Sequence, residues 1–572
     1  MLSELFCICV QPNNHWICIY DNFIYVQPNL GSTMTYLVKK KIKGRAYYYE
    51  YESYRVGGKV KHRCVHYLGK SKDLRKKGEP LFGPADITVH SSVDYGSVVS
   101  LYTLAERIHL SEIVYNAAKK GGGEHIGKLV EIMVINRCIE PVSRNKLRDW
   151  YEKTALPIFL GIPPDKVHPQ IFYNAMNYLT DKTILKIQKE LFQTVKRIYG
   201  IETSTIFYDL TSTYFEGTKC PLGEFGYSTD HRPDKLQINI GMGVDRDCIP
   251  VTHEVFTGSV KDVTTVQAFA EKLKTEFGLE NPIMVIDRGM ISEENLDHLL
   301  ELGYDYIVAR KLGPLESKIV YSIPDTEYVR TMLSNYSEDR ELWLAETQVG
   351  RRRLIVCWNK NKAEDDKTFR ETMITKTMQG LEKVKNGCGK RKLKTKEQVY
   401  HKTYTVLEKY KTKRFFNINI NKHGAPRLKF ELIDKETEKA DWLDGKFILE
   451  TSSRNLLAVD IAQVYHDRDT IEKFFQTLKD IVELRPTYVY TERHVKAHVF
   501  ICILAVLLLS LIKKMLKETN KDLSSIKALQ ILDGIKRVEF TVDGKGTIVR
   551  TTQINNQQRE IISILNVAPI SL

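Results

Sequence analysis

Hydrophobic residues follow two different periodicities in two consecutive parts of the chain. Over residues 97–200 they recur at the spacing of amphipathic helices, and prolines at positions 163, 164 and 169 interrupt the pattern. Ser143 is the expected N-cap of a helix over Arg144–Glu152. From residue 203 the hydrophobic residues form short continuous runs, which are typical of buried strands. The pattern predicts three strands, a helix, a strand, a helix and a strand: Thr205–Leu210, Gln237–Val244, Ile249–Phe256, Thr264–Phe277, Pro282–Ile286, a helix from the N-cap Ser292 to Leu302, and Tyr306–Ala309.

This order of elements is the arrangement of a ribonuclease H-like mixed α/β sheet. Residues 312–445 interrupt it: the Lys-rich stretch Lys360–Lys413 is predicted to form charged helices, flanked by the strands Leu354–Trp358 and Phe416–Ile420. We therefore expect a ribonuclease H-like mixed sheet with an inserted α+β domain, preceded by a small basic β region and a helical domain. The expected division is 1–33, an extension that is not native; 34–85, the basic β-rich region; 86–200, a helical DNA-binding domain; 201–311 and 446–515, the two parts of the ribonuclease H-like domain; 312–445, the insertion; and 516–572, a C-terminal region for dimerisation.

The composition changes abruptly at Met34. Residues 1–33 contain no Lys or Arg, so we interpret Met34 as the natural initiator, with a genuine β-rich cap as the alternative. Residues 34–77 contain 14 Lys and Arg against three carboxylates, a net charge of +11. The runs Ile42–Ser53 and Lys61–Leu68 are rich in Tyr and Val and predict two strands joined by a turn. This basic region is expected to contact DNA phosphates, although a solvated edge strand would have the same composition.

The overall composition narrows the class of protein. With 42% hydrophobic and 27% charged residues, the 572-residue chain is neither disordered nor a small disulfide scaffold. Its ten cysteines form no C-x-x-C pair, which indicates a reduced, cytoplasmic protein without a structural zinc site. The longest apolar run, Val499–Ile512, is shorter than the roughly 20 residues of a membrane span and predicts a buried helix. The net charge of +14 therefore favours nucleic acid as the partner, with no membrane.

Two aspartates follow apolar strands of the predicted sheet. Asp209 comes directly after the run Ile206–Tyr208, and Asp287 comes directly after Met284–Ile286. Because the first and fourth strands of a ribonuclease H-like sheet are neighbours, the two carboxylates are expected to converge. Carboxylate oxygens are the ligands that hard divalent cations prefer, so the sequence predicts a metal site at this place.

A third acid lies in a regular pattern further along the chain. Tyr465, Arg468, Glu472 and Lys479 fall within about 60° of one another on a helical wheel, a single stripe on one helix. Apolar residues occupy the adjacent face of the same helix. An amphipathic surface helix with ion pairs is the alternative interpretation.

These residues resemble the DDE transposases of prokaryotic insertion sequences, in the group that carries a YREK motif. The resemblance rests on Asp209 in YDLTSTYFEG, Asp287 in VIDRGM, Glu472 in the YREK pattern and the segment GYSTDHRPDKLQ at 226–237. It implies that Asp209, Asp287 and Glu472 are catalytic and hold two Mg²⁺ ions, for which Mn²⁺ can substitute. It also implies that Arg468 and Lys479 bind DNA phosphates, while Tyr465 orients one of them.

The resemblance further implies an activity and its partners. The expected enzyme performs metal-dependent cleavage and strand transfer at the inverted repeats of an insertion sequence, in cut-and-paste transposition. Its partners would be double-stranded DNA, at the transposon ends and the target, and a second copy in a homodimer. It would be a cytoplasmic, nucleoid-associated protein of a prokaryote.

Other interpretations remain open from the sequence. A ribonuclease H-like nuclease or resolvase would use the same metals without strand transfer, and a transposase-derived DNA-binding protein would keep the fold without cleavage. Asp230, His231 and Asp234 have no role assigned by the sequence, and a charged turn accounts for them equally well. The tryptophans at 343, 358 and 442 could stack on a DNA base, although core packing is the preferred interpretation.

Overall fold

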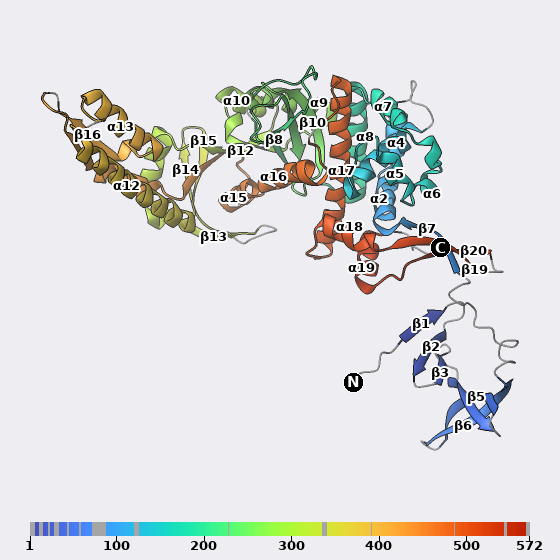
Figure 1. The fold of residues 1–572 in the computed structure, drawn as a ribbon. Coiled ribbons are helices and arrows are strands. Elements are labelled where there is room, and N and C mark those ends of the chain that lie inside the picture. Colours follow the sequence, from blue (N-terminus) through green and yellow to red (C-terminus); the bar gives the residue numbers. More distant parts are fainter. Residues whose placement is uncertain are drawn as a thin grey trace. The chain divides into compact units, whose positions relative to one another are not determined.

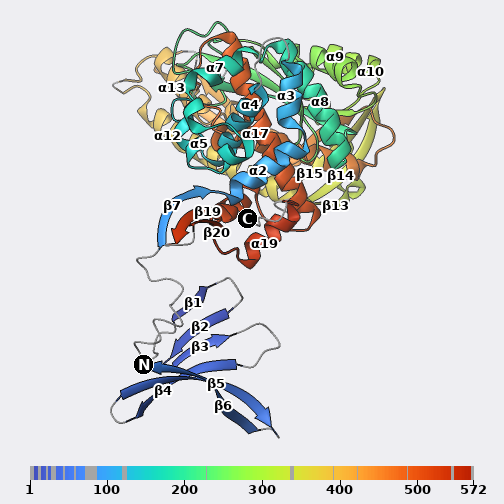
Figure 2. The same ribbon diagram turned by 90° about the vertical axis from the view of Figure 1, so that its right-hand side faces the viewer.

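The computed structural model describes most of the chain in two compact units (Figures 1 and 2). The smaller unit consists of residues 1–92 and 537–551, and the larger of residues 93–536 and 552–571. The described residues are 6–10, 15–20, 23–27, 34–42, 45–56, 59–70, 87–118, 125–226, 228–334, 340–390, 392–421, 423–485, 487–542 and 546–567.

The smaller unit contains two antiparallel sheets. Six strands follow one another in sequence order: β1 (Phe6–Val10), β2 (His15–Tyr20), β3 (Phe23–Gln27), β4 (Met34–Ile42), β5 (Arg45–Val56) and β6 (Lys59–Lys70). The second sheet has the order β20 (Gly546–Thr551), β19 (Lys536–Val542) and β7 (Ile87–Asp94). The strand–turn–strand pattern predicted for the basic region is confirmed by β5 and β6. Tyrosines and cations pack together there, since the Lys40 Nζ lies 5.0 Å from the ring of Tyr51 and donates to its hydroxyl at 2.6 Å.

The larger unit begins with helices. They are α2 (Gly96–Arg107), α3 (Leu110–Ala117), α4 (Ile126–Ile139), α5 (Leu147–Glu152), α6 (Leu156–Leu160), α7 (Pro169–Asn177) and α8 (Asp181–Tyr199). Pro169 occupies the first turn of α7, where its missing N–H costs nothing, and Thr180 caps α8 by accepting from the Thr183 N–H. The predicted N-cap at Ser143 is wrong: its carbonyl accepts from Lys146 N in a turn, and α5 starts only at Leu147.

A nine-stranded mixed sheet forms the centre of the larger unit. Its order is β10 (Pro250–Thr257), β9 (Gln237–Val244), β8 (Thr205–Tyr214), β11 (Ile283–Ile286), β12 (Asp305–Arg310), β18 (Lys446–Thr451), β15 (Arg352–Trp358), β14 (Arg340–Val349) and β13 (Val329–Leu333). The first five have the 3-2-1-4-5 order of a ribonuclease H-like sheet, with β8, β11 and β12 parallel. The helices α9 (Val266–Phe277) and α10 (Glu293–Glu301) connect them, so the predicted fold class is confirmed.

The insertion starts by extending this sheet. After α11 (Pro314–Ser322), β13, β14 and β15 add to the sheet edge, and β18 closes the gap between β15 and β12. The chain leaves at Trp358 and returns at Lys446, which are paired across β15 and β18. Between them lie α12 (Lys360–Gly387), α13 (Lys396–Lys409), β16 (Phe416–Ile420), β17 (Leu428–Leu432) and α14 (Asp434–Leu443). The strands β13, β14 and β15, predicted as part of an interruption, thus belong to the central sheet.

One long helix packs against both the sheet and the helices. It is α17 (Glu492–Glu518), and it contacts β10, α4, α7 and α8 (Figure 1). By length and composition it could cross a membrane, yet 94% of its most apolar window is buried inside the protein. The apolar run Val499–Ile512 therefore forms a buried helix, as predicted. Of the shorter helices, α15 (Ala458–His466) and α16 (Asp469–Gln476) pack against strands of the central sheet, α18 (Ser525–Asp533) packs against α17, and α19 (Asn556–Ile564) packs against α18.

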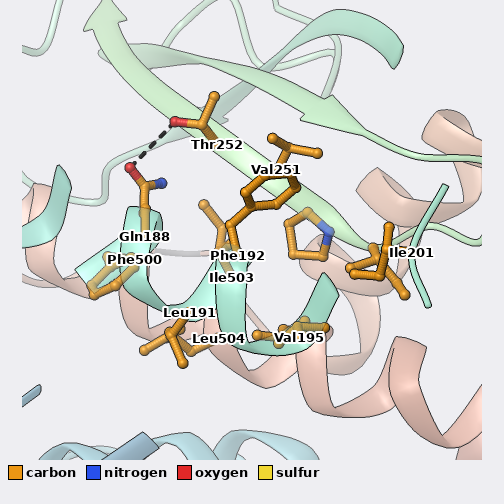
Figure 3. Close-up of a pocket in the computed structure, with 13 residues that line it drawn as sticks. Gln188, Leu191, Phe192, Val195, Ile201, Val251, Thr252, Phe500, Ile503 and Leu504 are labelled. Carbon is orange, nitrogen blue, oxygen red and sulfur yellow. Dashed lines mark hydrogen bonds between the residues drawn. The ribbon is translucent and has the colours of Figure 1, made fainter. Parts of the chain in front are cut away.

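A small cavity marks the contact of α17 with α8 and β10 (Figure 3). It measures about 30 Å³ and is lined mostly by apolar side chains, among them Phe192, Val251 and Phe500. The one polar contact drawn in Figure 3 is the hydroxyl of Thr252 donating to the Gln188 side-chain oxygen at 3.3 Å. A space of this size has room for about one water molecule. It is a packing defect of the core and not a ligand site.

Candidate active site

Parallel pairing of two strands brings the first two acids together. Tyr208 of β8 is paired with Ile286 of β11, so Asp209 and Asp287 follow at the same level of the sheet. Asp287 leaves its strand, as predicted, and its Oδ2 accepts from the Gly289 N–H at 3.3 Å. Asp209 does not end its strand, because β8 continues to Tyr214 and pairs there with β9. The predicted strand end at Leu210 is therefore four residues short.

The electrostatic environment of the two aspartates differs. Burial raises the pKa of Asp209 to about 7, and the neighbouring carboxylates of Asp287 and Asp262 act in the same direction. Burial also acts to raise the pKa of Asp287, but the guanidinium of Arg468 and backbone N–H groups hold it below the usual value. The site thus gathers negative charge that a cation can compensate.

Asp262 is an acid of this site that the sequence analysis missed. It lies at the start of a short 3₁₀ turn after β10, and burial together with Asp287 raises its pKa. A Cβ added at Gly289 would lie 3.7 Å from Asp287 Oδ2 and 3.9 Å from Asp262 Oδ2, so both carboxylates lie beside this glycine. No spacing or motif distinguishes Asp262 from other acids in charged loops, because only the fold returns this loop to β11.

The YREK residues do not lie on one continuous helix. Tyr465 belongs to α15, which ends at His466, and Arg468 is the N-cap of α16, which carries Glu472. Lys479 lies in a π-helical turn, Thr477–Ile481, whose wider winding rotates it away from an α-helical stripe. The single stripe predicted at 100° per residue is therefore wrong.

Arg468 connects the second and third acids. Its guanidinium forms ion pairs with Asp287, through Nη1, and with Glu472 Oε1 at 3.2 Å. The ring of Tyr465 lies 5.5 Å from this guanidinium, a cation–π contact that fixes its orientation. The side chain of Glu472 is 59% exposed and has room to move. The structure thus brings Asp209, Asp287, Arg468 and Glu472 to one place.

Lys479 points to a different partner. Its Nζ donates to Asp230 Oδ1 at 2.8 Å and to Thr229 Oγ1 at 3.0 Å. Asp230 also pairs with Arg485 at 2.5 Å, and its side chain is only 3% exposed. This acid therefore anchors the segment after α16 and belongs to the packing. Asp234 pairs instead with Arg232 of its own exposed turn, as a charged turn would.

An open cavity lies beside the acids. It measures about 440 Å³ and its lining includes Ser212, Thr229, Lys261, Asp262 and Gly289. Within the described residues, no three His, Cys, Asp or Glu side chains are already arranged as a metal site. The donors nevertheless suit a hard divalent cation, because they are all carboxylate oxygens and because Arg468 already supplies positive charge between two of them.

A lysine ammonium group of the same chain lies over each of the three tryptophan rings. Lys360 Nζ lies 3.5 Å from the ring centroid of Trp343, and Lys446 Nζ lies 4.7 and 4.5 Å from those of Trp358 and Trp442. Trp343 and Trp358 also pack on an apolar cluster beside β15 and β18. The core-packing interpretation is thus confirmed for these two rings.

Comparison with known proteins identifies the class to which this fold and this site belong. A profile described as "Transposase DDE domain" matches residues 200–508, more than half of the chain, so the protein belongs to the DDE transposases. These enzymes cleave DNA and transfer its strands, and they use divalent metal ions. A second profile, the N-terminal domain of IS1634 family transposases, matches residues 37–80, and together the two matches indicate an IS1634-family transposase of an insertion sequence. The interpretation as a nuclease or resolvase without strand transfer is thereby set aside.

The likeness of this chain to solved structures is weak. The chain is similar to a piggyBac transposase solved by cryo-electron microscopy as a synaptic complex with hairpin DNA. The identity is 10%, the TM-score is 0.35, and the match covers 83% of this chain and 82% of that one. The comparison with curated proteins gave no match.

Proposed function

We propose that Asp209, Asp287 and Glu472 are the catalytic carboxylates of this transposase and together hold two Mg²⁺ ions, which Mn²⁺ can replace. The observation that carries the proposal is the chain of contacts from Asp209, beside Asp287, through Arg468 to Glu472. When bound, the ions supply activation of the attacking oxygen and stabilisation of the leaving oxygen in phosphodiester cleavage and transesterification.

The protein's own residues position the reacting strand. Asp209 and Asp287 are held by the paired strands β8 and β11, so their separation changes little during the reaction. Glu472 approaches from α16; its side chain is exposed and pairs with Arg468. With its pairs to Asp287 and Glu472 opened, Arg468 would turn to a phosphate of the DNA end, with Tyr465 behind it. Lys479 contacts phosphate only if its pair with Asp230 opens.

The remaining domains supply DNA and partner contacts. We infer that the basic region 34–85 and the helices of 86–200 bind transposon ends, and that 516–572 contributes to a homodimer. Exposed basic strands with interleaved tyrosines support the first part, because Lys39, Lys41 and Lys61 are exposed to solvent. The enzyme would act on its inverted repeats by cut-and-paste transposition, at the nucleoid in the cytoplasm of a prokaryote.

The test uses a duplex that carries the inverted repeat flanking the reading frame. Asp209→Asn, Asp287→Asn and Glu472→Gln should each abolish strand cleavage and joining in Mg²⁺, while binding of the duplex without metal stays near wild type. Asp234→Asn is the matched control, because that acid pairs with Arg232 outside the site. Retained cleavage in any of the three variants would refute the assignment of that residue.

A further inference from the structure

A second basic cavity lies outside the carboxylate site. It measures about 460 Å³ and is formed by the segment after α4, by α7 and by residues 483–498. Its lining includes Arg137, Arg144, Tyr173, Arg485, Tyr488 and His498. Cavities of this size bind small ligands or parts of larger ones. None of these residues belongs to the YREK pattern.

Two arginines of this cavity lack an acidic partner. Among the described residues, neither Arg137 nor Arg144 forms an ion pair with a carboxylate, whereas Arg485 pairs with Asp230 and Asp480. Arg137 Nη1 donates to the carbonyl oxygens of residues 482 and 483, at 3.3 and 3.2 Å. Arg144 donates from Nε to a methionine sulfur at 3.1 Å and lies 3.3 Å from the Nδ1 of a buried histidine. Its guanidinium also lies 5.7 Å from the ring of Tyr173, a cation–π contact, and none of these contacts supplies a negative charge.

The charge balance of the cavity is therefore positive. Burial and the nearby Arg137 lower the pKa of Arg144 to about 10, which leaves it charged at neutral pH. Burial and the same two arginines lower the pKa of His498 well below its usual value, so this ring stays neutral. The one carboxylate of the lining, Glu483, is exposed to solvent. A partly buried cation without a counter-ion is costly, and an anionic ligand would remove that cost.

Neighbouring groups identify the kind of anion. Tyr488 lines the same cavity as the arginines, and 76% of it is exposed to solvent. The guanidinium of arginine and the hydroxyl of tyrosine are both typical ligands of DNA backbone phosphates. The segment that carries Tyr488 is also tied to the catalytic sheet, because the Thr487 N–H donates to the carbonyl of Tyr214, the last residue of β8, at 3.3 Å.

We propose that Arg137 and Arg144, with Tyr488, form a binding site for one backbone phosphate of the DNA on which this transposase acts. The site deepens the proposed function and rests on it only in assuming that DNA is the partner. It needs no metal and no contribution from Asp209. The phosphate site includes Tyr488, in the segment that follows Glu472 and Lys479. A DNA strand bound there would be held in register with β8, the strand that carries Asp209.

The test measures affinity for the inverted-repeat duplex at several NaCl concentrations, in EDTA, with the full chain. Arg144→Gln should weaken binding about tenfold and reduce the slope of log Kd against log salt by about 1, because one phosphate contact is lost. Arg144→Lys should keep the slope. Arg197→Gln is the control, since this exposed arginine on α8 lies outside the cavity and is expected to change neither quantity. Unchanged affinity and slope in Arg144→Gln would overturn the proposal.

A second measurement separates DNA from other anions and from misfolding. Inorganic phosphate, at an ionic strength matched with NaCl, should raise the Tm of the wild type and not that of Arg144→Gln. Without phosphate the variant should lose little stability, because it gives up a cation–π contact and no ion pair. Phosphate binding combined with unchanged DNA affinity would also overturn the assignment, as would an Arg144→Lys variant that fails to restore the slope. Because the assay contains no metal, Asp209→Asn should behave as wild type, so this site and the metal site can fail separately.

Discussion

Arg468 is the residue whose replacement should separate metal binding from DNA binding. In the structure it pairs with Asp287 and Glu472, two of the proposed metal ligands. Arg468→Gln removes a cation that competes with the metal for both carboxylates. Because the side chains of Asp287 and Glu472 are 41% and 59% exposed, solvent screens these pairs and each contributes only about 0.2–1 kcal/mol. The two pairs together contribute about 0.4–2 kcal/mol, so metal affinity without DNA should increase by about two- to thirtyfold.

The effect on DNA should have the opposite sign. A charge-assisted contact to phosphate contributes on the order of 1.5–3 kcal/mol, so the variant should bind the transposon end about ten- to a hundredfold more weakly. Calorimetric titration with Mn²⁺ measures the first effect, and titration of labelled duplex in EDTA measures the second. Arg232→Gln is the control, because that arginine pairs with an acid of its own turn. Weaker metal binding in Arg468→Gln would refute the competition and show that Arg468 instead orders Glu472 for the metal.

Three further predictions concern the rest of the chain. Burial raises the pKa of Glu131 to about 8, so the folded protein retains a proton that the unfolded chain releases near pH 4.5, and stability should fall as the pH rises through this window. In urea unfolding, Glu131→Gln should remove this fall in stability and should be more stable than the wild type at pH 9, by at most about 5 kcal/mol. An equal pH dependence of stability in the two proteins would contradict this prediction. Replacing both Lys39 and Lys41 by Gln should reduce the salt slope of DNA binding by about 1 to 2 with unchanged Tm, and an unchanged slope would mean that β4 does not face DNA. Gly243→Ala should lower stability by about 1–3 kcal/mol, because its Cβ would lie 2.6 Å from the Phe269 ring, and an unaltered Tm would show that α9 can shift away from the sheet.

The sequence was sufficient to predict the centre of the fold. Continuous apolar runs identified β8 and β11, and their order predicted that Asp209 and Asp287 would be neighbours, which the parallel pairing confirms. Runs of this kind are buried on both faces of a sheet, so they leave a strong signal in the sequence. The strands of the insertion were assigned to a separate interruption, because the pairing of β15 with β18 joins residues about 90 positions apart and no local pattern records it.

The details of the site were less accessible. Tyr465, Arg468 and Glu472 were identified from spacing, but the break between α15 and α16 has no Pro or Gly signal in the sequence. The pairing of Lys479 with Asp230 also joins distant parts of the chain, so ion-pair partners could not be read from charge alone. Asp262 has no distinguishing neighbour in the sequence and becomes a candidate only through its position beside Gly289.

The central claim, that the acids bind the catalytic ions directly, is tested most directly by changing the ligand atom. Asp287→Cys replaces a carboxylate oxygen with a thiolate sulfur, a softer ligand that Mg²⁺ accepts poorly and Mn²⁺ accepts better. The measurement is the ratio of the cleavage rate in Mn²⁺ to that in Mg²⁺ on the inverted-repeat duplex. If Asp287 is a ligand, cleavage in Mg²⁺ is lost, activity in Mn²⁺ is partly retained, and the ratio rises well above that of the wild type. A variant that cleaves in Mg²⁺ as the wild type does, or whose two rates fall in equal proportion, would contradict direct coordination by Asp287.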